Sequence, residues 1–383
     1  MPVNLLKLPC LIREMIVTEL SDHQEVFLLS LCSRRTKFLV VKARIKLPNV
    51  SFQFQKCRGY NQLNIGFELH PTNHELGVYK KVWYPVTSVL HRETLELKEV
   101  FTVKLGNDYE ADTKFVSWCE EDGKLLHRME CANEPMGIQK ALQEYINSIF
   151  HYSGTNKLYL LMKCEENLPN ISNVKDIEIE IPDEIIEPQF LTKILTTYPN
   201  HRSLVISKKN IVGELPRDSP FFQVQDISVH SHYGTDLFHN FNGRNMRCYS
   251  VVLPEQDIIQ FIQKWISNEA YHNLETLSFF KERGIINAAL VRQAIVFEEY
   301  NRHEPEKRPV RYDVVTPIMP MVRRYFLRNE EWFEVKRITD GKRAFVKFFH
   351  GLCHFFVHKD PLYASNDDDY VVIKDFGTFT SLR

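Results

Sequence analysis

Apolar residues near the start of the chain recur at helical spacing. The stripe fits positions i, i+3, i+4, i+7 and i+8 and consists of Leu8, Leu11, Ile12, Met15, Ile16 and Leu20. It predicts a helix over about 9–20, with Pro9 in the first turn. The segment Ser21–Gln24 matches a capping box, so its serine hydroxyl and glutamine side chain are predicted to cap a second helix over 25–32. A third apolar run, Phe38–Val41, completes a set of three short helices.

Three helices of this length carry more apolar surface than they can enclose by themselves. Part of that surface must pack elsewhere, and two interpretations are open. The helices either cap the core of the following domain or dock on another protein. A cap would bury Leu8, Pro9, Ile12 and Leu28 within the chain, whereas a docking module would leave them exposed.

Apolar and polar residues alternate with period two from Val50 to about Leu126, which predicts a β-rich segment. Its strand signals are Phe52 with Phe54, Phe101 with Val103, and Phe115–Cys119, and Asp122-Gly123 supplies a tight hairpin turn. The next apolar stripe has helical spacing again and predicts an amphipathic helix over about 137–150.

Strand and helix signals then alternate. Strand candidates recur at intervals of roughly 20–27 residues, over Lys157–Met162, Asp176–Ile181, Arg202–Ser207, Gln225–His230, Arg247–Val252 and Leu274–Phe279. Helices are predicted after Pro188 and around Trp265. The period favours a degenerate leucine-rich-repeat-like array, in which each unit buries its apolar edge on the next. An ordinary α/β domain is the alternative. Further on, period-two runs around Asp340-Gly341 predict a C-terminal β-hairpin.

The predicted fold class is therefore α+β or α/β, and the 383 residues suggest two or three domains. Residues 1–46 are expected to form the short three-helix module, and residues 47–155 the β-rich segment that ends in the amphipathic helix. Residues 156–360 would form the repeat-like strand-helix region with its hairpin, and residues 361–383 a polar tail.

Composition and charge narrow the class of protein. With 44% apolar and 12% aromatic residues, the chain has ample material for a core. Its net charge of -1 gives no global field that would attract nucleic acid or an anionic membrane. The charge is unevenly spread, because residues 1–46 carry eight basic and four acidic side chains, and the remainder carries a net -5. The basic run from Arg34 to Lys46 is interpreted as a solvated face or as steering toward an acidic partner.

The cysteine pattern and the chain start bear on localisation. The eight cysteines lie far apart and include no Cys-x-x-Cys pair, which is typical of free thiols in a reducing compartment. The first residues lack the uninterrupted apolar stretch of a secretory signal, and no apolar run approaches the roughly 20 residues that span a bilayer. We therefore expect an intracellular protein of the cytoplasm, the nucleus or both, without a membrane partner.

The order of residues in the predicted N-terminal helices resembles an F-box, in particular that of the large nematode family of F-box proteins. The resemblance covers about residues 4–45 and rests on Leu8-Pro9, on the helix with Ile12, and on the run Leu29-Ser30-Leu31-Cys32-Ser33-Arg34-Arg35-Thr36-Lys37. It implies a module that inserts into the Skp-type adaptor of a cullin-RING ubiquitin ligase. The adaptor-binding residues that it implies are Leu8, Pro9, Ile12, Ile16, Leu28, Leu29, Cys32 and Phe38. Many F-boxes outside this family have a tryptophan where this chain has Phe38.

A second and looser resemblance covers about residues 185–350. It rests on the helix with Trp265, on the phrase Asn273-Leu274-Glu275-Thr276-Leu277-Ser278, and on the hairpin with Asp340-Gly341 and Ala344. These pieces look like the nematode F-box associated domain, type 2. The resemblance implies a substrate-recognition region that follows the F-box.

Candidate chemistry is sparse. The one metal-like constellation is His350, Cys353, His354 and His358, whose nitrogen and sulfur atoms suit zinc. The aromatic residues around it favour an extended strand instead, so no metal and no cofactor are expected. The sequence contains no glycine-rich phosphate loop, no His-Glu-x-x-His motif and no Gly-x-Ser-x-Gly elbow.

The sequence therefore predicts a non-catalytic F-box substrate receptor that links an unknown protein substrate to a Skp-cullin-RING ubiquitin ligase. The alternative is a leucine-rich-repeat-like scaffold whose N-terminal helices only cap the array. The two differ in whether the apolar face of the N-terminal helices is exposed.

Overall fold

The structure of the chain is a computed structural model. It describes residues 5–20, 22–69, 82–92, 100–105, 109–119, 125–132, 135–164, 167–182, 185–207, 213–230, 234–314, 316–318 and 323–358. The predicted turn at Asp122-Gly123 and the polar tail at 361–383 lie outside these residues.

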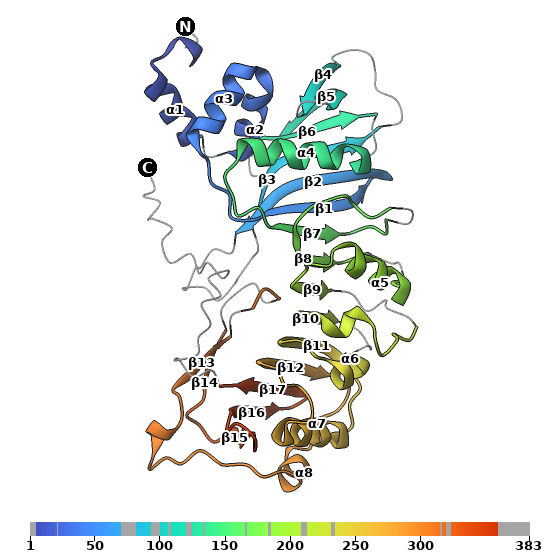
Figure 1. Cartoon of the computed structure of the whole chain (residues 1–383), viewed down its shortest axis with the longest axis vertical. Coiled ribbons are helices and arrows are strands. Elements are labelled where there is room, and N and C mark those ends of the chain that lie inside the picture. The colour runs from blue at the N-terminus through green and yellow to red at the C-terminus, as the bar shows by residue number, and fades with distance from the viewer. Residues whose placement is uncertain are drawn as a thin grey trace.

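One mixed sheet of 15 strands runs the length of the described chain (Figure 1). Its spatial order is β15-β16-β17-β12-β11-β10-β9-β8-β7-β1-β2-β3-β6-β5-β4. The strands are β1 (Val50–Cys57), β2 (Tyr60–Leu69), β3 (Val82–His91), β4 (Phe101–Leu105), β5 (Tyr109–Cys119), β6 (Leu125–Cys131), β7 (Asn156–Leu160), β8 (Val174–Ile179), β9 (Ser203–Ile206), β10 (Asp226–His230), β11 (Asn245–Val251), β12 (Thr276–Lys281), β15 (Trp332–Lys336), β16 (Arg343–Phe349) and β17 (Leu352–Val357). A separate antiparallel pair is formed by β13 (Arg311–Val314) and β14 (Arg323–Phe326).

The middle of the sheet is parallel and its two ends are largely antiparallel. Strands β7 to β12 pair with one another in chain order, all in parallel, and β7 also pairs in parallel with β1. At one end, β1 to β6 form the β-rich segment. At the other end, β12, β17, β16 and β15 pair antiparallel. All six predicted repeat strands exist, and the mixed α+β class is confirmed.

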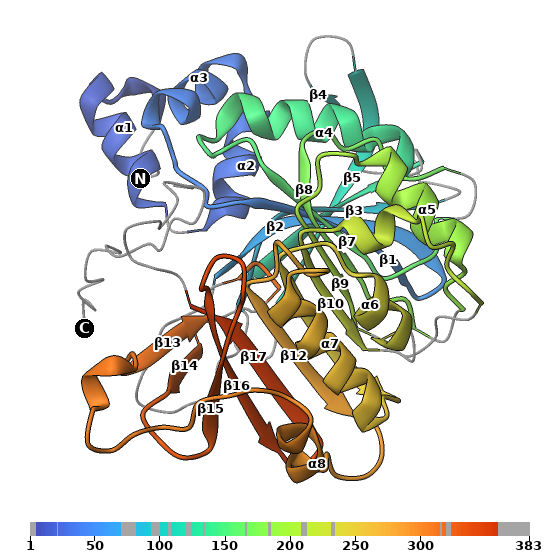
Figure 2. The ribbon, with the colours of Figure 1, turned by 60° about the horizontal axis from the view of Figure 1, so that its bottom comes forward.

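The larger helices cover one face of this sheet (Figure 2). The α-helices are α1 (Cys10–Glu19), α2 (His23–Cys32), α3 (Arg34–Ala43), α4 (Pro135–Ile149), α5 (Pro188–Thr197), α6 (Gly234–Asn240), α7 (Glu255–Ser267) and α8 (Ala288–Gln293), and the short 3-10 helices are η1 (Leu5–Lys7), η2 (Pro220–Gln223) and η3 (Pro305–Lys307). Apolar residues of α4, α5 and α7 recur at helical spacing, so each helix presents one apolar stripe to the sheet. The helices predicted at 137–150, after Pro188 and around Trp265 are confirmed.

The core is one continuous hydrophobic cluster between the helices and the sheet. It includes Val17 and Phe27 of the N-terminal helices, Phe52 of β1, Trp265 of α7 and Phe355 of β17. A smaller cluster lies on the other side of the sheet, where Tyr312 and Val314 of β13 and Tyr325 of β14 pack with Trp332, Phe345 and Phe356. The N-terminal helices therefore share their core with the strands that follow them.

The hairpin predicted around Asp340-Gly341 is confirmed, because β15 and β16 pair from Trp332–Lys347 to Lys336–Arg343. Gly341 has a φ of 70°, in the left-handed region that glycine adopts without a steric penalty. The Asp340 carboxylate accepts a hydrogen bond from the backbone N–H of Lys342 at 3.0 Å and so closes the turn.

The capping box predicted at Ser21–Gln24 is wrong in its details. Helix α2 begins at His23, and Asp22 is its N-cap, with a carboxylate oxygen that accepts from the backbone N–H of Gln24 at 2.8 Å. Gln24 does not reach back to the cap, because its side chain bonds to a strand of the sheet. Ser21 lies outside the described residues. Ser33 caps α3 by accepting from the backbone N–H of Thr36 at 3.1 Å.

Candidate functional site

Helix α2 fixes the N-terminal helices to the sheet. It packs against β3, and Val26 and Phe27 are buried. The Phe27 ring meets the Tyr145 ring of α4 edge-on, with 5.9 Å between centroids. The Ser30 hydroxyl lies 3.1 Å from the Tyr145 hydroxyl. Burial raises the pKa of Tyr145, so this phenol stays protonated and available as a donor. Helix α2 thus behaves as a cap on the neighbouring core.

Helices α1 and α3 present apolar side chains outward. Only Val17 is buried on α1, although most of that helix is apolar. Large exposed apolar side chains on the two helices are Leu11 (68%), Ile12 (41%), Met15 (54%), Ile16 (39%), Phe38 (58%) and Val41 (41%). We call these six residues the apolar face. Several large exposed apolar side chains on two neighbouring helices favour an interaction site over an ordinary solvated surface.

Polar contacts join the two helices of the apolar face. The Lys42 ammonium of α3 lies 3.7 Å from the Glu14 carboxylate of α1 and 5.1 Å from the centre of the Phe38 ring. The two helices also pack against each other. Next to this contact, Lys37 lies 4.2 Å above the Tyr145 ring, and burial lowers the pKa of its ammonium group. Arg34 and Arg35 are exposed, so the predicted basic run is largely a solvated rim.

The predicted adaptor-binding residues divide into two groups in the structure. Pro9, Ile12, Ile16, Cys32 and Phe38 are exposed, and Leu8, Leu28 and Leu29 are half-buried. The structure leaves Ile12, Ile16 and Phe38 exposed on α1 and α3, two helices that pack against each other, whereas Leu28 and Leu29 belong to the helix that packs on the sheet. Sequence reasoning did not assign Leu11, Met15 and Val41 to the site, although helical spacing puts Leu11 and Met15 on the same stripe as Ile12.

The metal-like constellation does not come together. His350 is in the turn before β17, with a φ of 53°. Cys353 belongs to the main core, whereas His354 points to the other side of β17, because neighbouring residues of a strand alternate. The His354 ring nitrogen Nδ1 lies 2.8 Å from the Ser278 hydroxyl. Within the described part of the chain, no group of three His, Cys, Asp or Glu side chains is placed to hold a metal ion.

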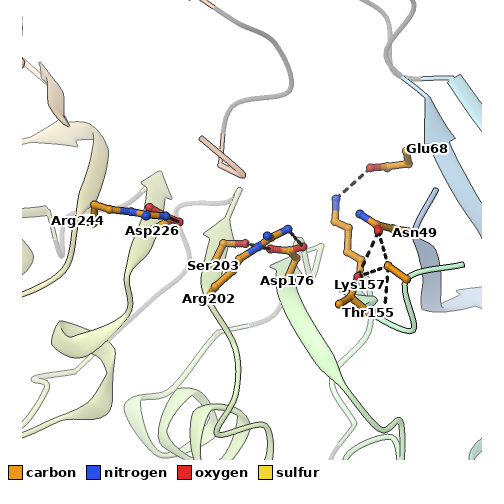
Figure 3. Close-up of polar contacts among 10 residues, drawn as sticks. Asn49, Glu68, Thr155, Lys157, Asp176, Arg202, Ser203, Asp226 and Arg244 are labelled. Atoms are coloured by element: carbon orange, nitrogen blue, oxygen red, sulfur yellow. Dashed lines mark hydrogen bonds and ion pairs between the residues drawn. The ribbon is translucent and has the colours of Figure 1, made fainter. Parts of the chain in front are cut away.

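A second surface with marked chemistry is the face of the sheet opposite the helices. At the starts of the parallel strands it carries a row of ion pairs (Figure 3). Arg202, which precedes β9, contacts Asp176 of β8 through two bonds of 3.0 Å. Arg244, which precedes β11, contacts Asp226 of β10 at 3.2 Å. Since each arginine reaches the preceding strand, the pairs hold the register of the parallel strands. We call this surface the polar face.

The same row continues to β7, and its side chains are buried or half-buried. Lys157 lies 3.0 Å from Glu68 and 2.5 Å from Glu178. Burial alone would lower the pKa of Lys157, but Glu178 and Glu68 raise it, so the ammonium group stays charged. Asp226 is fully buried and also accepts from the Asn245 amide at 2.5 Å. This part of the polar face has its charges satisfied and is structural.

Comparison of the chain with protein-family models, with curated proteins and with solved structures found no match in any of the three. Among the helices of the described residues, none is long and apolar enough to cross a membrane.

Proposed function

We propose that this protein is an F-box substrate receptor, which binds a Skp-type adaptor through its N-terminal helices and so joins a substrate to a cullin-RING ubiquitin ligase. The observation that carries the proposal is the exposure of Ile12, Ile16 and Phe38. The F-box resemblance assigns these three residues to the adaptor, and they are exposed on two helices that pack against each other.

The arrangement of the three helices suits docking. Helix α2 is held against β3 and α4, so α1 and α3 are presented on a fixed base. A preorganised face loses less conformational entropy on binding than a mobile one. The excess of basic side chains in residues 1–46 would steer an acidic adaptor toward this face.

The larger part of the chain would serve as the recognition region for an unknown protein substrate, in the cytoplasm or the nucleus. We interpret β7 to β12 with α5, α6 and α7 as a degenerate leucine-rich-repeat-like array, because parallel strands in chain order alternate with helices of unequal length. Such a receptor needs no catalytic residues or cofactor of its own. It raises the effective concentration of a substrate lysine near the ligase.

The experiment is a binding measurement between the purified chain and a Skp-type adaptor. Ile12→Asp and Phe38→Asp each place a charge in the apolar face, where the side chain is exposed in the free protein, so folding should be unaffected. If these residues are interface anchors, each variant should weaken binding by about 30-fold or more. Val296→Asp is the matched control, because Val296 is 88% exposed and belongs to the loop after α8.

Two outcomes would contradict the proposal. One is that the unmodified chain does not bind the adaptor at all, in which case the N-terminal helices serve as a cap of a scaffold protein. The other is that Ile12→Asp and Phe38→Asp bind as well as Val296→Asp. Thermal unfolding of all three variants checks that each is folded.

A further inference from the structure

The polar face changes character along the strands. At the strand starts its basic side chains contact carboxylates, as Lys157, Arg202 and Arg244 do. Two residues beyond Asp226 on β10, Ser228, Arg247, Ser278 and His354 lie side by side on β10, β11, β12 and β17. Among the described residues, no carboxylate lies within ion-pair distance of Arg247 or of Arg323 on the nearby strand β14. Within the described part of the chain, the positive charge here is therefore left without a carboxylate partner.

Aromatic rings hold these basic groups in place. The Arg247 guanidinium lies 4.7 Å from the centre of the Tyr249 ring, whose other neighbour is the His230 ring at 3.9 Å. The Tyr325 ring lies 4.9 Å from the His354 ring. Arg247, His230, Tyr249 and Tyr325 are half-buried and Arg323 is exposed. We call His230, Arg247, Tyr249, Arg323, Tyr325 and His354 the basic patch.

Burial is the main cause of the pKa shifts in the basic patch. Burial lowers the pKa of Arg247, Arg323 lowers it further, and Tyr249 and Tyr325 oppose the decrease. Burial lowers the pKa of His230, and Arg247 adds to that effect. The basic groups of the patch therefore repel one another, in addition to their partial loss of hydration.

A half-buried guanidinium without a carboxylate has lost part of its hydration without a compensating ion pair. A ligand carboxylate would restore the missing interaction through charge-assisted hydrogen bonds. The two guanidinium groups, of Arg247 and Arg323, belong to separate strands, β11 and β14, and the rings beside them to β10, β11, β14 and β17. Two cations on separate strands, lined by aromatic rings, match carboxylates spaced along an extended segment better than they match one phosphate group.

We propose that the basic patch binds an acidic segment of a partner protein, with ligand carboxylates held by Arg247 and Arg323 and with Tyr249 and Tyr325 lining the contact. This inference does not depend on adaptor binding, because α1 and α3 lie at the top of Figure 1, whereas the strands that carry the basic patch, β10, β11, β14 and β17, lie in its lower half. If the protein is a substrate receptor, the acidic segment belongs to its substrate.

The test is the binding of a fluorescein-labelled peptide with an Asp-Glu repeat to the full chain, measured by fluorescence anisotropy. An Asn-Gln peptide of the same length is the uncharged control. Arg247→Met and Arg323→Met should each weaken binding of the acidic peptide by about 10-fold or more. Arg217→Met removes the same charge from an exposed loop residue outside the patch and should change binding less than about 2-fold.

Stability provides a second measurement that separates binding from folding. Arg247→Met removes a half-buried cation that lacks a partner, so its melting temperature should equal or exceed that of the unmodified chain. A marked drop in melting temperature would assign Arg247 a structural role and overturn the proposal.

Other results would also overturn it. The proposal is wrong if the full chain binds the acidic peptide and the Asn-Gln peptide equally well, or if Arg217→Met weakens binding as much as Arg247→Met does. Binding of a phosphoserine peptide without binding of the Asp-Glu peptide would assign the patch to phosphate. Binding only after Asp367, Asp368 and Asp369 are all changed to Asn would assign it to the chain's own acidic segment. None of these measurements includes the adaptor, so failure here is distinct from failure of the F-box proposal.

Discussion

The guanidinium group of Arg337 lies over the indole ring of Trp265, with 4.6 Å between the guanidinium carbon and the ring centre. Trp265 is fully buried on α7, and Arg337, which directly follows β15, is 3% exposed. Beside this contact, the backbone N–H of Ile338 donates to the carbonyl of Ile266 at 2.9 Å. The cation and the backbone bond together attach the β15–β16 hairpin to the last turn of α7.

This contact predicts that Arg337→Met will destabilise the fold. Methionine keeps the apolar stem but loses the cation over the ring and the 3.4 Å contact with Asp340. We expect a loss of about 2 kcal/mol in the free energy of unfolding, measured by urea denaturation. Arg337→Lys should recover only part of it, because lysine cannot stack its charge as a plane. Arg302→Met, at an exposed ion pair, is the control. If Arg302→Met loses as much free energy of unfolding as Arg337→Met, the indole contact adds no stability beyond that of an exposed ion pair.

The two parts of this contact were predictable from the sequence, but the contact was not. Helical spacing around Trp265 and period-two runs around Asp340-Gly341 are local signals, and both elements exist as predicted. Trp265 and Arg337 are separated by 72 positions in the sequence, and tertiary packing brings them together. The hairpin reaches this place because β17 pairs between β16 and β12 in the sheet. Strand positions follow from local alternation, whereas strand order depends on long-range pairing that the pattern does not encode.

The candidate site shows the same division. Helical spacing placed Ile12 and Ile16 on one stripe, but it could not say whether that stripe would face the sheet or solvent. The structure assigns the sheet contact to α2, because Val26 and Phe27 are buried there. Gln24 was predicted to cap its own helix. Its side chain instead forms hydrogen bonds with the backbone of His127 on β6, more than 100 positions away in the sequence.

Those bonds lead to a prediction about the attachment of the N-terminal helices. The Gln24 amide donates to the carbonyl of His127 at 3.0 Å, and its oxygen accepts from the backbone N–H of His127 at 3.3 Å. Strand β6 pairs with β3 only from Met129 onward, so Gln24 satisfies backbone groups at a position that β3 does not reach. Gln24→Ala leaves both groups without this partner and should cost about 2 kcal/mol.

The effect should be local as well as global. Hydrogen exchange in α2 should become faster in Gln24→Ala, while exchange in β9 and β10 should be unchanged, because these strands lie far along the sheet. Gln263→Ala is the matched control, since Gln263 is exposed and makes one bond to the carbonyl of Ala294 at 3.0 Å. Unchanged protection of α2 in Gln24→Ala would show that packing of Val26 and Phe27 alone holds the helix.

The final prediction concerns acid sensitivity at His354, which is 8% exposed. Its environment contains the Ser278 hydroxyl, the rings of Tyr325 and Trp332, and three cations, Lys347, Arg323 and Arg247. Burial, with added repulsion from these cations, lowers the pKa of His354 to about 4 from an ordinary value of 6.5. The folded protein therefore keeps this imidazole neutral at a pH where the unfolded chain protonates it.

The sign of the effect follows from proton uptake. Between pH 6.5 and about 4 the unfolded state binds more protons than the folded state, so the free energy of unfolding falls as the pH is lowered through this window. The shift corresponds to about 3 kcal/mol. His354→Asn removes the titrating group, so its stability should decline less steeply in the same window, as measured by urea denaturation at several pH values. His303→Asn, at an exposed histidine, should retain the full decline of the unmodified chain. If His354→Asn and the unmodified chain lose stability in parallel, the acid sensitivity arises from other groups, of which His23 and His201 also have a pKa that burial lowers.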